Sequence, residues 1–243
     1  MAIMLVLGAT SDIAQASSLS LAKLGWDLFL AGRDMERLET IATDIHIRSG
    51  ATVRCFHLDV LDAESVSSFW NSLPEEPGGV LCAIGFLGDQ EKARQSPELA
   101  EVIVRSNFSG LLPIISQAAN AFEANKCGVI IGISSVAGDR GRSSNYIYGS
   151  AKAAFTAFLS GLRARLFSSG VQVITVKPGF VATRMTEKLN LPGLLTAEPE
   201  QVAIDICKAI EKKRDVVYSC WFWRWIMVII CSLPEFLFKR IKI

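Results

Sequence analysis

Short apolar runs alternate with helix-length segments along most of the chain, and this alternation constrains the fold more than any other feature of the sequence. The predicted strands are 3–7, 27–30, 52–56, 80–84, 129–133 and 171–176, and the predicted helices are 13–24, 35–49, 63–73, 96–123, 148–167 and 199–214. Most of the strand runs are continuously apolar, as in strands buried on both faces. Because right-handed crossovers return each helix to the sheet, the pattern predicts an α/β fold in three layers (α/β/α), a doubly wound parallel sheet between two layers of helices.

The chain has 243 residues, which suits one large domain followed by a tail. The composition changes near Asp215. Residues 216–243 contain 20 hydrophobic side chains out of 28, whereas hydrophobic residues make up 50% of the whole chain. We therefore predict a single domain over residues 1–215 and an apolar, amphipathic helical tail over residues 216–243.

The charge balance and the cysteines exclude several classes of protein. Lys and Arg number 25 against 24 Asp and Glu, so the net charge is +1 and no global positive field is available to hold nucleic acid. The six cysteines form no CxxC pair and have no histidine at metal-ligand spacing. We therefore expect no nucleic-acid partner, no metal, and free thiols in a reducing compartment, the cytoplasm.

A glycine follows the first predicted strand, at the point where a helix begins. Gly8 allows a tight turn, and the helix N-terminus after it offers free N–H groups to a pyrophosphate. The loop residues expected to bind a dinucleotide are Gly8, Thr10, Ser11, Asp12 and Ile13. Of the three glycines of the usual fingerprint the sequence has only Gly8, and Asp12 must point away from the phosphates because it would repel them. A plain strand-to-helix turn capped by Asp12 is the alternative.

The ends of the next three strands bear on which dinucleotide is bound. Arg33 follows the second strand, where a cation would bind the 2′-phosphate of NADP(H). Asp34 would instead bind the ribose of NAD(H), or cap the next helix, so NADP(H) is the predicted cofactor and NAD(H) the alternative. After the third strand, Asp59 would accept a hydrogen bond from adenine or cap a helix. After the fourth, the small residues Ala83 and Gly85 allow a ligand to approach the backbone closely.

Three residues with complementary chemistry follow the fifth predicted strand. Ser135 lies at the strand end, and Tyr148 and Lys152 are four residues apart, on one face of the next helix. A free tyrosine ionises near a pKa of about 10, too high for efficient proton transfer at neutral pH. We expect the ammonium of Lys152 to lower the pKa of Tyr148, and the hydroxyl of Ser135 to bind the same substrate oxygen.

Together these motifs resemble the classical short-chain dehydrogenase/reductases over about residues 1–215. The resemblance rests on Gly8-x5-Ala14, Leu58-Asp59-Val60, Ala83-Ile84-Gly85, Asn107, Ser134-Ser135, Tyr148-x3-Lys152 and Pro178-Gly179-Phe180-Val181-x-Thr183, in the order and spacing of the family. The sequence departs from the family in the glycine loop and at residues 83–85, which stand where the family has Asn-Asn-Ala-Gly. These departures bear on cofactor affinity more than on catalysis.

The resemblance implies an NADP(H)-dependent oxidoreductase of Rossmann type that reduces a ketone to a secondary alcohol. Tyr148 would be the general acid, Ser135 would orient the carbonyl, Lys152 would hold the nicotinamide ribose, and Asn107 would link Lys152 to solvent through water. The residues expected around the cofactor are Gly8, Thr10, Ser11, Asp12, Ile13, Arg33, Asp59, Val60, Ala83, Gly85, Tyr148, Lys152, Pro178, Gly179, Val181 and Thr183. The family also implies a homodimer or homotetramer.

Substrate choice in this family resides after Thr183 and in the C-terminus, and both segments are apolar here. The side chains expected to form an apolar ceiling over the substrate are Met185, Leu189, Leu191, Leu194 and Leu195. The glycine loop and the tryptophan-rich tail are similar to those of reductases that act on decaprenylphosphoryl-keto-ribose, so the expected substrate is an apolar or lipid-linked ketone. A 3-oxoacyl or other generic ketone reductase is one alternative, and a non-catalytic NADPH-sensing interaction protein is another.

The tail has two interpretations. Tryptophans beside an apolar helix face, with basic residues near the end, are typical of a helix in the headgroup region of an anionic membrane. The same amphipathicity suits a tail that packs on a neighbouring subunit or over its own active site. The stretch 221–233 is shorter than the roughly 20 apolar residues of a membrane span. The membrane interpretation therefore predicts peripheral binding through residues 221–243, on the inner face of the membrane.

Overall fold

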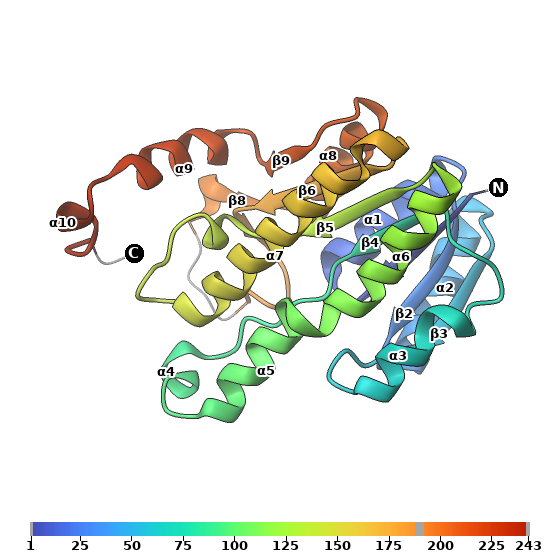
Figure 1. Ribbon diagram of the computed structural model, residues 1–243, viewed down its shortest axis with the longest axis horizontal. Coiled ribbons are helices and arrows are strands. Elements are labelled where there is room, and N and C mark those ends of the chain that lie inside the picture. Colours follow the sequence, from blue (N-terminus) through green and yellow to red (C-terminus); the bar gives the residue numbers. More distant parts are fainter. Residues whose placement is uncertain (1, 188–191, 242–243) are drawn as a thin grey trace.

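A single parallel sheet forms the centre of the molecule (Figure 1). The computed structural model describes residues 2–187 and 192–241. The sheet has seven strands in the order β3-β2-β1-β4-β5-β6-β9, and all neighbouring pairs are parallel. The strands are β1 Ile3–Leu7, β2 Asp27–Gly32, β3 Val53–His57, β4 Gly79–Cys82, β5 Val129–Ile133, β6 Gln172–Pro178 and β9 Val216–Ser219. The predicted α/β fold with a doubly wound parallel sheet is confirmed.

Helices cover both faces of the sheet, which explains why most of its strands are predominantly apolar. One face carries α1 Asp12–Lys23, α2 Met35–Ser49 and α8 Pro199–Glu211, and the other carries α3 Ala63–Ser72, α6 Leu112–Asn125 and α7 Tyr146–Leu166. Successive side chains of a strand point to opposite faces. In β1, accordingly, Met4 and Val6 belong to the first core and Leu5 and Leu7 to the second.

The helix predicted over residues 96–123 is interrupted. α5 covers Pro97–Asn107, a short 3₁₀ turn covers Ser109–Leu111, and α6 begins at Leu112. A Cβ at Gly110 would overlap the carbonyl oxygen of Val60, so the 3₁₀ turn packs closely against the loop that follows β3. Pro113 lacks an N–H donor and is tolerated only in the first turn of a helix, which fixes the start of α6. The other predicted helices and strands begin and end within three residues of their predicted bounds.

The seventh strand was not predicted. β9 pairs with β6 from Thr175 opposite Val216 to Pro178 opposite Ser219. Its four residues are the first four of the segment assigned to the tail, so the sheet continues past the boundary predicted at residue 215. Beyond β6, the short strands β7 Phe180–Val181 and β8 Thr196–Ala197 form a separate pair.

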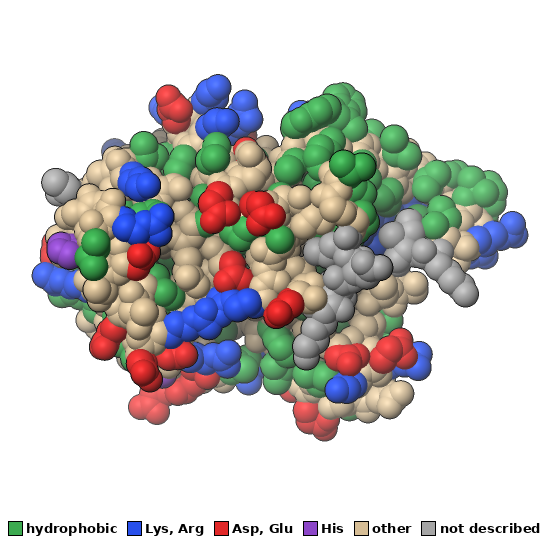
Figure 2. All heavy atoms as spheres, turned by 180° about the vertical axis from the view of Figure 1, so that it is seen from behind, with side chains coloured by type: hydrophobic (Ala, Val, Ile, Leu, Met, Phe, Trp, Pro, Cys, Tyr) green, Lys and Arg blue, Asp and Glu red, His purple; other side chains and the backbone are tan. Residues whose placement is uncertain are grey.

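The remaining tail consists of α9 Phe222–Ser232 and α10 Glu235–Phe238, at one end of the molecule (Figure 1). Trp223 and Met227 of α9 are buried, whereas Trp221, Trp225 and Ile229 are 74%, 58% and 63% exposed. Figure 2 shows apolar side chains gathered at this end. The tail therefore packs on its own domain through one face and leaves the opposite face apolar and open.

Within residues 2–187 and 192–241, no single helix has the length and apolar character needed to cross a membrane. Only the bent pair 97–107 and 109–125 meets that test of length and composition, and only when the two helices are taken together.

Candidate active site

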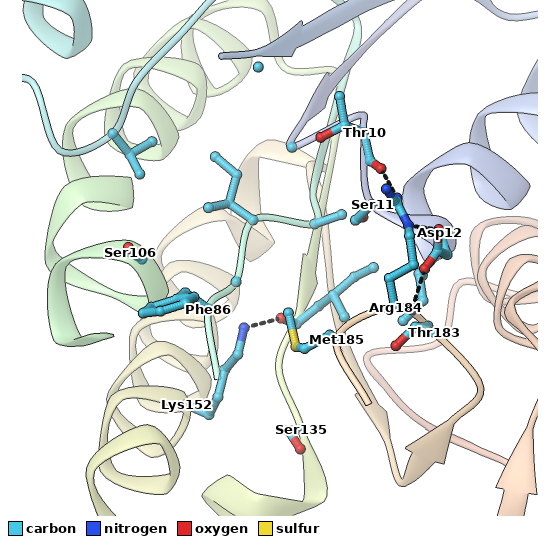
Figure 3. A pocket seen from close by; sticks show the side chains of 18 of the residues that line it. Thr10, Ser11, Asp12, Phe86, Ser106, Ser135, Lys152, Thr183, Arg184 and Met185 are labelled. Atoms are coloured by element: carbon cyan, nitrogen blue, oxygen red, sulfur yellow. Dashed lines mark hydrogen bonds and ion pairs between the residues drawn. The ribbon is translucent and has the colours of Figure 1, made fainter. Parts of the chain in front are cut away.

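A cavity of about 460 Å³ opens at the carboxyl ends of the strands (Figure 3). Loops from β1, β2, β3, β4, β5 and β6 contribute to its walls, as expected for a doubly wound sheet. The predicted site residues that line it are Gly8, Thr10, Ser11, Asp12, Ile13, Arg33, Asp59, Val60, Ala83, Gly85, Ser135, Tyr148, Lys152, Pro178, Gly179, Val181 and Thr183. Asn107 is fully buried behind the wall. The fold thus brings together residues that are up to 175 positions apart in the sequence, from Gly8 to Thr183.

The glycine loop is held tightly against the end of the fourth strand. Gly8 has a φ of +78°, and a Cβ there would lie 2.8 Å from Cγ1 and 2.9 Å from the backbone nitrogen of Ile84. Only glycine fits this position, for both conformation and space. Ser11 is the cap of α1, since its hydroxyl accepts from the N–H of Ala14 at 3.2 Å. The alternative in which Asp12 caps this helix is therefore wrong.

Asp12 points instead at a residue from the far side of the cavity. Its carboxylate accepts hydrogen bonds from the backbone nitrogen of Arg184 at 2.8 Å and from its Nε at 2.7 Å. The same guanidinium donates to the carbonyl oxygen of Thr10, as Figure 3 shows. The segment after Thr183 is thereby fastened to the glycine loop. Sequence reasoning missed this role of Arg184, although an acid among residues expected to bind phosphates was a signal that a cation lay nearby.

After the second strand, the structure gives Asp34 and Arg33 different roles, which the sequence left open. The carboxylate of Asp34 accepts from the N–H of Arg37 at 3.1 Å and caps α2. Arg33 is exposed and lines the cavity. At the third strand end, Asp59 accepts from the N–H of Leu61 at 3.0 Å, which shapes the turn after β3, and it lines the cavity as well.

Ser135 and Tyr148 both line the cavity wall. Ser135 follows β5 and also accepts from the N–H of Ala137 at 3.1 Å, while Tyr148 lies in the first turn of α7. Burial raises the pKa of Tyr148 to about 12, and the hydrogen bond with Ser135 opposes this rise. The expected lowering by Lys152 is not found: its Nζ lies 5.8 Å from the centre of the Tyr148 ring, and desolvation dominates.

Lys152 is buried and its ammonium lies at the cavity wall (Figure 3). Nζ donates to the carbonyl oxygen of Ile133 at 3.0 Å, which fixes the side chain against the end of β5. Burial lowers the pKa of Lys152 to about 8, because the charged form loses its hydration. This lysine therefore carries a charge that titrates close to neutral pH.

Asn107 holds the loop after β4 in place. Its amide nitrogen donates to the carbonyl oxygens of Phe86 at 2.7 Å and Ile103 at 2.8 Å, and its Oδ1 accepts from the N–H of Phe86 at 3.2 Å. Gly85 lies between Asn107 and Lys152, because a Cβ there would be 3.2 Å from Oδ1 and 3.4 Å from Nζ. The direct contacts of Asn107 are thus structural, and the predicted water link to Lys152 stays a prediction.

The apolar side chains that line the cavity are not all those predicted. Met185 lines the cavity, but Leu194 is 95% exposed and Leu195 packs against α9, away from the cavity. Leu189 and Leu191 lie outside the described residues. Two apolar side chains that sequence reasoning missed, Phe86 and Val102, complete this side of the cavity. Val102 had no local signal, since it lies on α5 and reaches the site only through the fold.

Comparison with known proteins places this site in a family. The model for short chain dehydrogenases matches residues 2–192. An uncharacterised oxidoreductase of Mycobacterium tuberculosis is 32% identical over 238 residues, or 97% of this chain and 95% of that protein. A short-chain dehydrogenase from Sphingobium yanoikuyae in complex with NADPH has the same fold, with a TM-score of 0.84 and 22% identity over 97% of each chain. The actinorhodin polyketide ketoreductase with NADPH gives 0.81 and 21% identity over 91% of this chain and 96% of its own. The chain therefore belongs to the short-chain dehydrogenase family and is an oxidoreductase that acts on a CH–OH or C=O group.

Proposed function

We propose that the protein is an NADP(H)-dependent reductase that converts an apolar ketone into a secondary alcohol. The observation that carries this proposal is that Ser135, Tyr148 and Lys152 line the same cavity, with Nζ of Lys152 5.8 Å from the centre of the Tyr148 ring. This arrangement places a proton donor, an orienting hydroxyl and a cation around one point in the cavity.

The three side chains have separate roles in the reduction. A bound nicotinamide cofactor supplies the hydride. With a pKa of about 12, the hydroxyl of Tyr148 keeps its proton at neutral pH, which is the form that protonates the substrate oxygen. Ser135 hydrogen-bonds the same oxygen and orients it. Lys152 gives one N–H to Ile133, and its other N–H groups are available to hold ribose hydroxyls.

The cavity fits a phosphorylated dinucleotide. Gly8 and Gly85 line the wall without a side chain, and residues 11–13, at the N-terminus of α1, line it as well. Asp34 is committed to capping α2, which leaves Arg33 as the charged side chain at the position that reads the adenosine ribose. This favours NADP(H) over NAD(H), and both structural neighbours named above were solved with NADPH.

The substrate side of the cavity favours an apolar ketone. Met185, Phe86 and Val102 line the cavity and offer a hydrocarbon surface to the substrate. A ketone carried on a lipid, such as a keto-sugar on a polyprenyl phosphate, would bury its chain against such residues. A 3-oxoacyl thioester is the second candidate, because its acyl chain would use the same apolar wall.

A substrate panel tests this proposal directly. The purified protein is expected to oxidise NADPH, followed by its absorbance, with long-chain or bulky ketones, and to do so faster than with NADH. Including 3-oxoacyl thioesters and a polyprenyl-linked keto-sugar distinguishes the two candidates. Tight NADPH binding without turnover of any carbonyl compound would contradict the proposal and favour a non-catalytic NADPH sensor.

We also propose that the enzyme is cytoplasmic, forms a homodimer or homotetramer, and attaches peripherally to a membrane through the open face of its tail. Trp221, Trp225 and Ile229 lie four residues apart on one side of α9, and Phe236 of α10 is exposed as well. Among the charged groups of the tail, the cations Arg224, Lys239 and Arg240 are exposed, whereas the acid Glu235 is paired with Arg140. An apolar face with an excess of free cations complements an anionic lipid surface.

Vesicle co-sedimentation tests this attachment. The full chain is expected to pellet with vesicles of phosphatidylglycerol and phosphatidylcholine, and a Trp225→Asp/Ile229→Asp variant is expected to stay in the supernatant, since two charges oppose insertion of the face. Ile47→Asp, on an exposed position of α2, is the matched control and should pellet like the unmodified chain. Equal pelleting of all three proteins would rule out membrane binding through this face.

A further inference from the structure

The buried face of α9 packs directly on the wall of the active site. Trp223 is 3% exposed, and a Cβ on Gly179 would overlap its indole ring, so the ring lies flush against the backbone of Gly179. Its ring also meets Phe180 edge-on, at 5.3 Å between centroids and 83° between planes. Gly179 itself lines the cavity. The side chain of Trp223 is thus separated from the cavity by one residue of backbone.

Trp223 also reaches the segment after Thr183. Its Nε1 donates to the carbonyl oxygen of Leu195 at 3.3 Å, and Leu195 and Phe180 belong to the same small apolar cluster. The indole therefore joins two chain segments, one before β7 at the cavity wall and one before β8. Both segments would lose their support if this ring were removed.

A second contact joins the tail to the loop between Ser135 and Tyr148. Arg140 lies in that loop, and its Nη1 donates to the carbonyl oxygens of Ile230 at 3.0 Å, Cys231 at 3.0 Å and Leu233 at 2.7 Å. These carbonyls are at the C-terminus of α9, where a cation is favoured by the helix dipole and by unpaired acceptors. Nη2 pairs with Glu235 at 2.7 Å, and the guanidinium lies 4.1 Å from the centre of the Phe238 ring.

Further contacts hold this loop to the sheet and to the tail. Asp139 pairs with Lys177 of β6 at 2.5 Å and accepts from the hydroxyl of Tyr218 of β9 at 2.9 Å. Arg142 is buried, and its Nη2 lies 3.4 Å from the sulfur of Met227 in α9. Residues 139–142 are therefore held from the tail side and from the sheet side at once. This segment connects Ser135 to the helix that carries Tyr148, so a change in its conformation would act on the alignment of those two side chains.

We infer that α9 and α10 are a positioning element of the active site: Arg140 couples the tail to the Ser135–Tyr148 loop, and Trp223 supports the cofactor wall at Gly179. This inference rests on the proposed function, since it concerns the alignment of its proton donor. The two anchors act on different parts of the site. Loss of Arg140 should disturb the alignment of Ser135 with Tyr148, whereas loss of Trp223 should disturb the wall on which the cofactor lies.

The Arg140→Ala variant tests the first anchor. We expect kcat to fall by about 10- to 100-fold, because a displacement of about 1 Å in reacting groups has an effect of this size. The dissociation constant for NADPH should stay unchanged. Amide hydrogen exchange over residues 136–147 should become faster, a readout that needs no substrate. Arg140→Lys, which keeps the charge and part of the hydrogen bonding, should restore part of kcat.

The Trp223→Ala variant tests the second anchor. We expect the dissociation constant for NADPH to rise by about 10-fold, as an apolar support of the wall is lost, and Trp223→Phe should keep most of the affinity. Arg48→Ala and Phe167→Ala are controls at exposed positions of α2 and the turn after α7, and they should leave kcat, NADPH affinity and exchange unchanged.

The outcomes distinguish the inference from the proposed function. If Arg140→Ala keeps kcat and the exchange rate of residues 136–147, the coupling is overturned. It is also overturned if kcat and NADPH affinity fall together, in proportion to a loss of folded protein measured by thermal unfolding. If Tyr148→Phe keeps full turnover in the same assay, the proposed function fails instead, whatever Arg140 does.

Discussion

Replacing Tyr148 with phenylalanine is expected to lower kcat for ketone reduction by about 10²- to 10⁴-fold, the range contributed by a positioned general acid. The variant keeps the ring, which lies in the first turn of α7, and removes only the hydroxyl. NADPH binding, measured by fluorescence titration, should be nearly unchanged. Loss of binding instead of turnover would count against the assignment of Tyr148 as the acid.

The matched control is Tyr146→Phe. Tyr146 lies two residues earlier in the same helix, is 44% exposed and does not line the cavity. Removal of its hydroxyl should leave kcat within about twofold, the scatter expected of a surface change. A comparable loss in both variants would show that any tyrosine-to-phenylalanine change disturbs the start of α7, and that no proton donor had been identified.

The sheet could be predicted from the sequence because buried parallel strands appear as continuous apolar runs. β1 and β5 begin and end where the apolar runs Ile3–Leu7 and Val129–Ile133 do, and α2 ends before Gly50, which adopts the left-handed conformation with φ +74°. β9 was missed because no local signal marks its end. Its four residues lie inside a longer apolar segment, and only pairing with β6 separates a strand from the tail that follows.

The spacing of Ser135, Tyr148 and Lys152 predicted that they meet in one cavity, but their electrostatics could not be predicted. Sequence places a lysine one helical turn from the tyrosine, and the structure shows that its ammonium donates to Ile133, while burial raises the pKa of Tyr148. Burial is a property of the whole fold. The contacts of Arg184 with Asp12, 172 residues apart, and of Arg140 with the tail are non-local for the same reason.

The second large effect is expected at Arg184, whose replacement with alanine should raise the dissociation constant for NADPH by about 30- to 100-fold, the equivalent of one or two charged hydrogen bonds. The variant loses a cation at the cavity and leaves the carboxylate of Asp12 unneutralised in the loop proposed to hold the phosphates. Folding should be little affected. The side chains of Arg184 and Asp12 are 44% and 25% exposed, and pairs so close to solvent contribute at most about 1 kcal/mol to stability.

A double-mutant cycle separates neutralisation of Asp12 from direct phosphate binding by Arg184. If the main task of Arg184 is to offset the acid, Asp12→Ala alone should bind NADPH at least as well as the unmodified chain, and Asp12→Ala/Arg184→Ala should recover most of the affinity lost in Arg184→Ala. The loss should also shrink at high ionic strength, because salt screens the repulsion between Asp12 and the phosphates. Strictly additive effects of the two substitutions, at low and at high salt, would show that Arg184 and Asp12 act independently on the cofactor. The acid in the glycine loop would then have no role that the pairing with Arg184 explains.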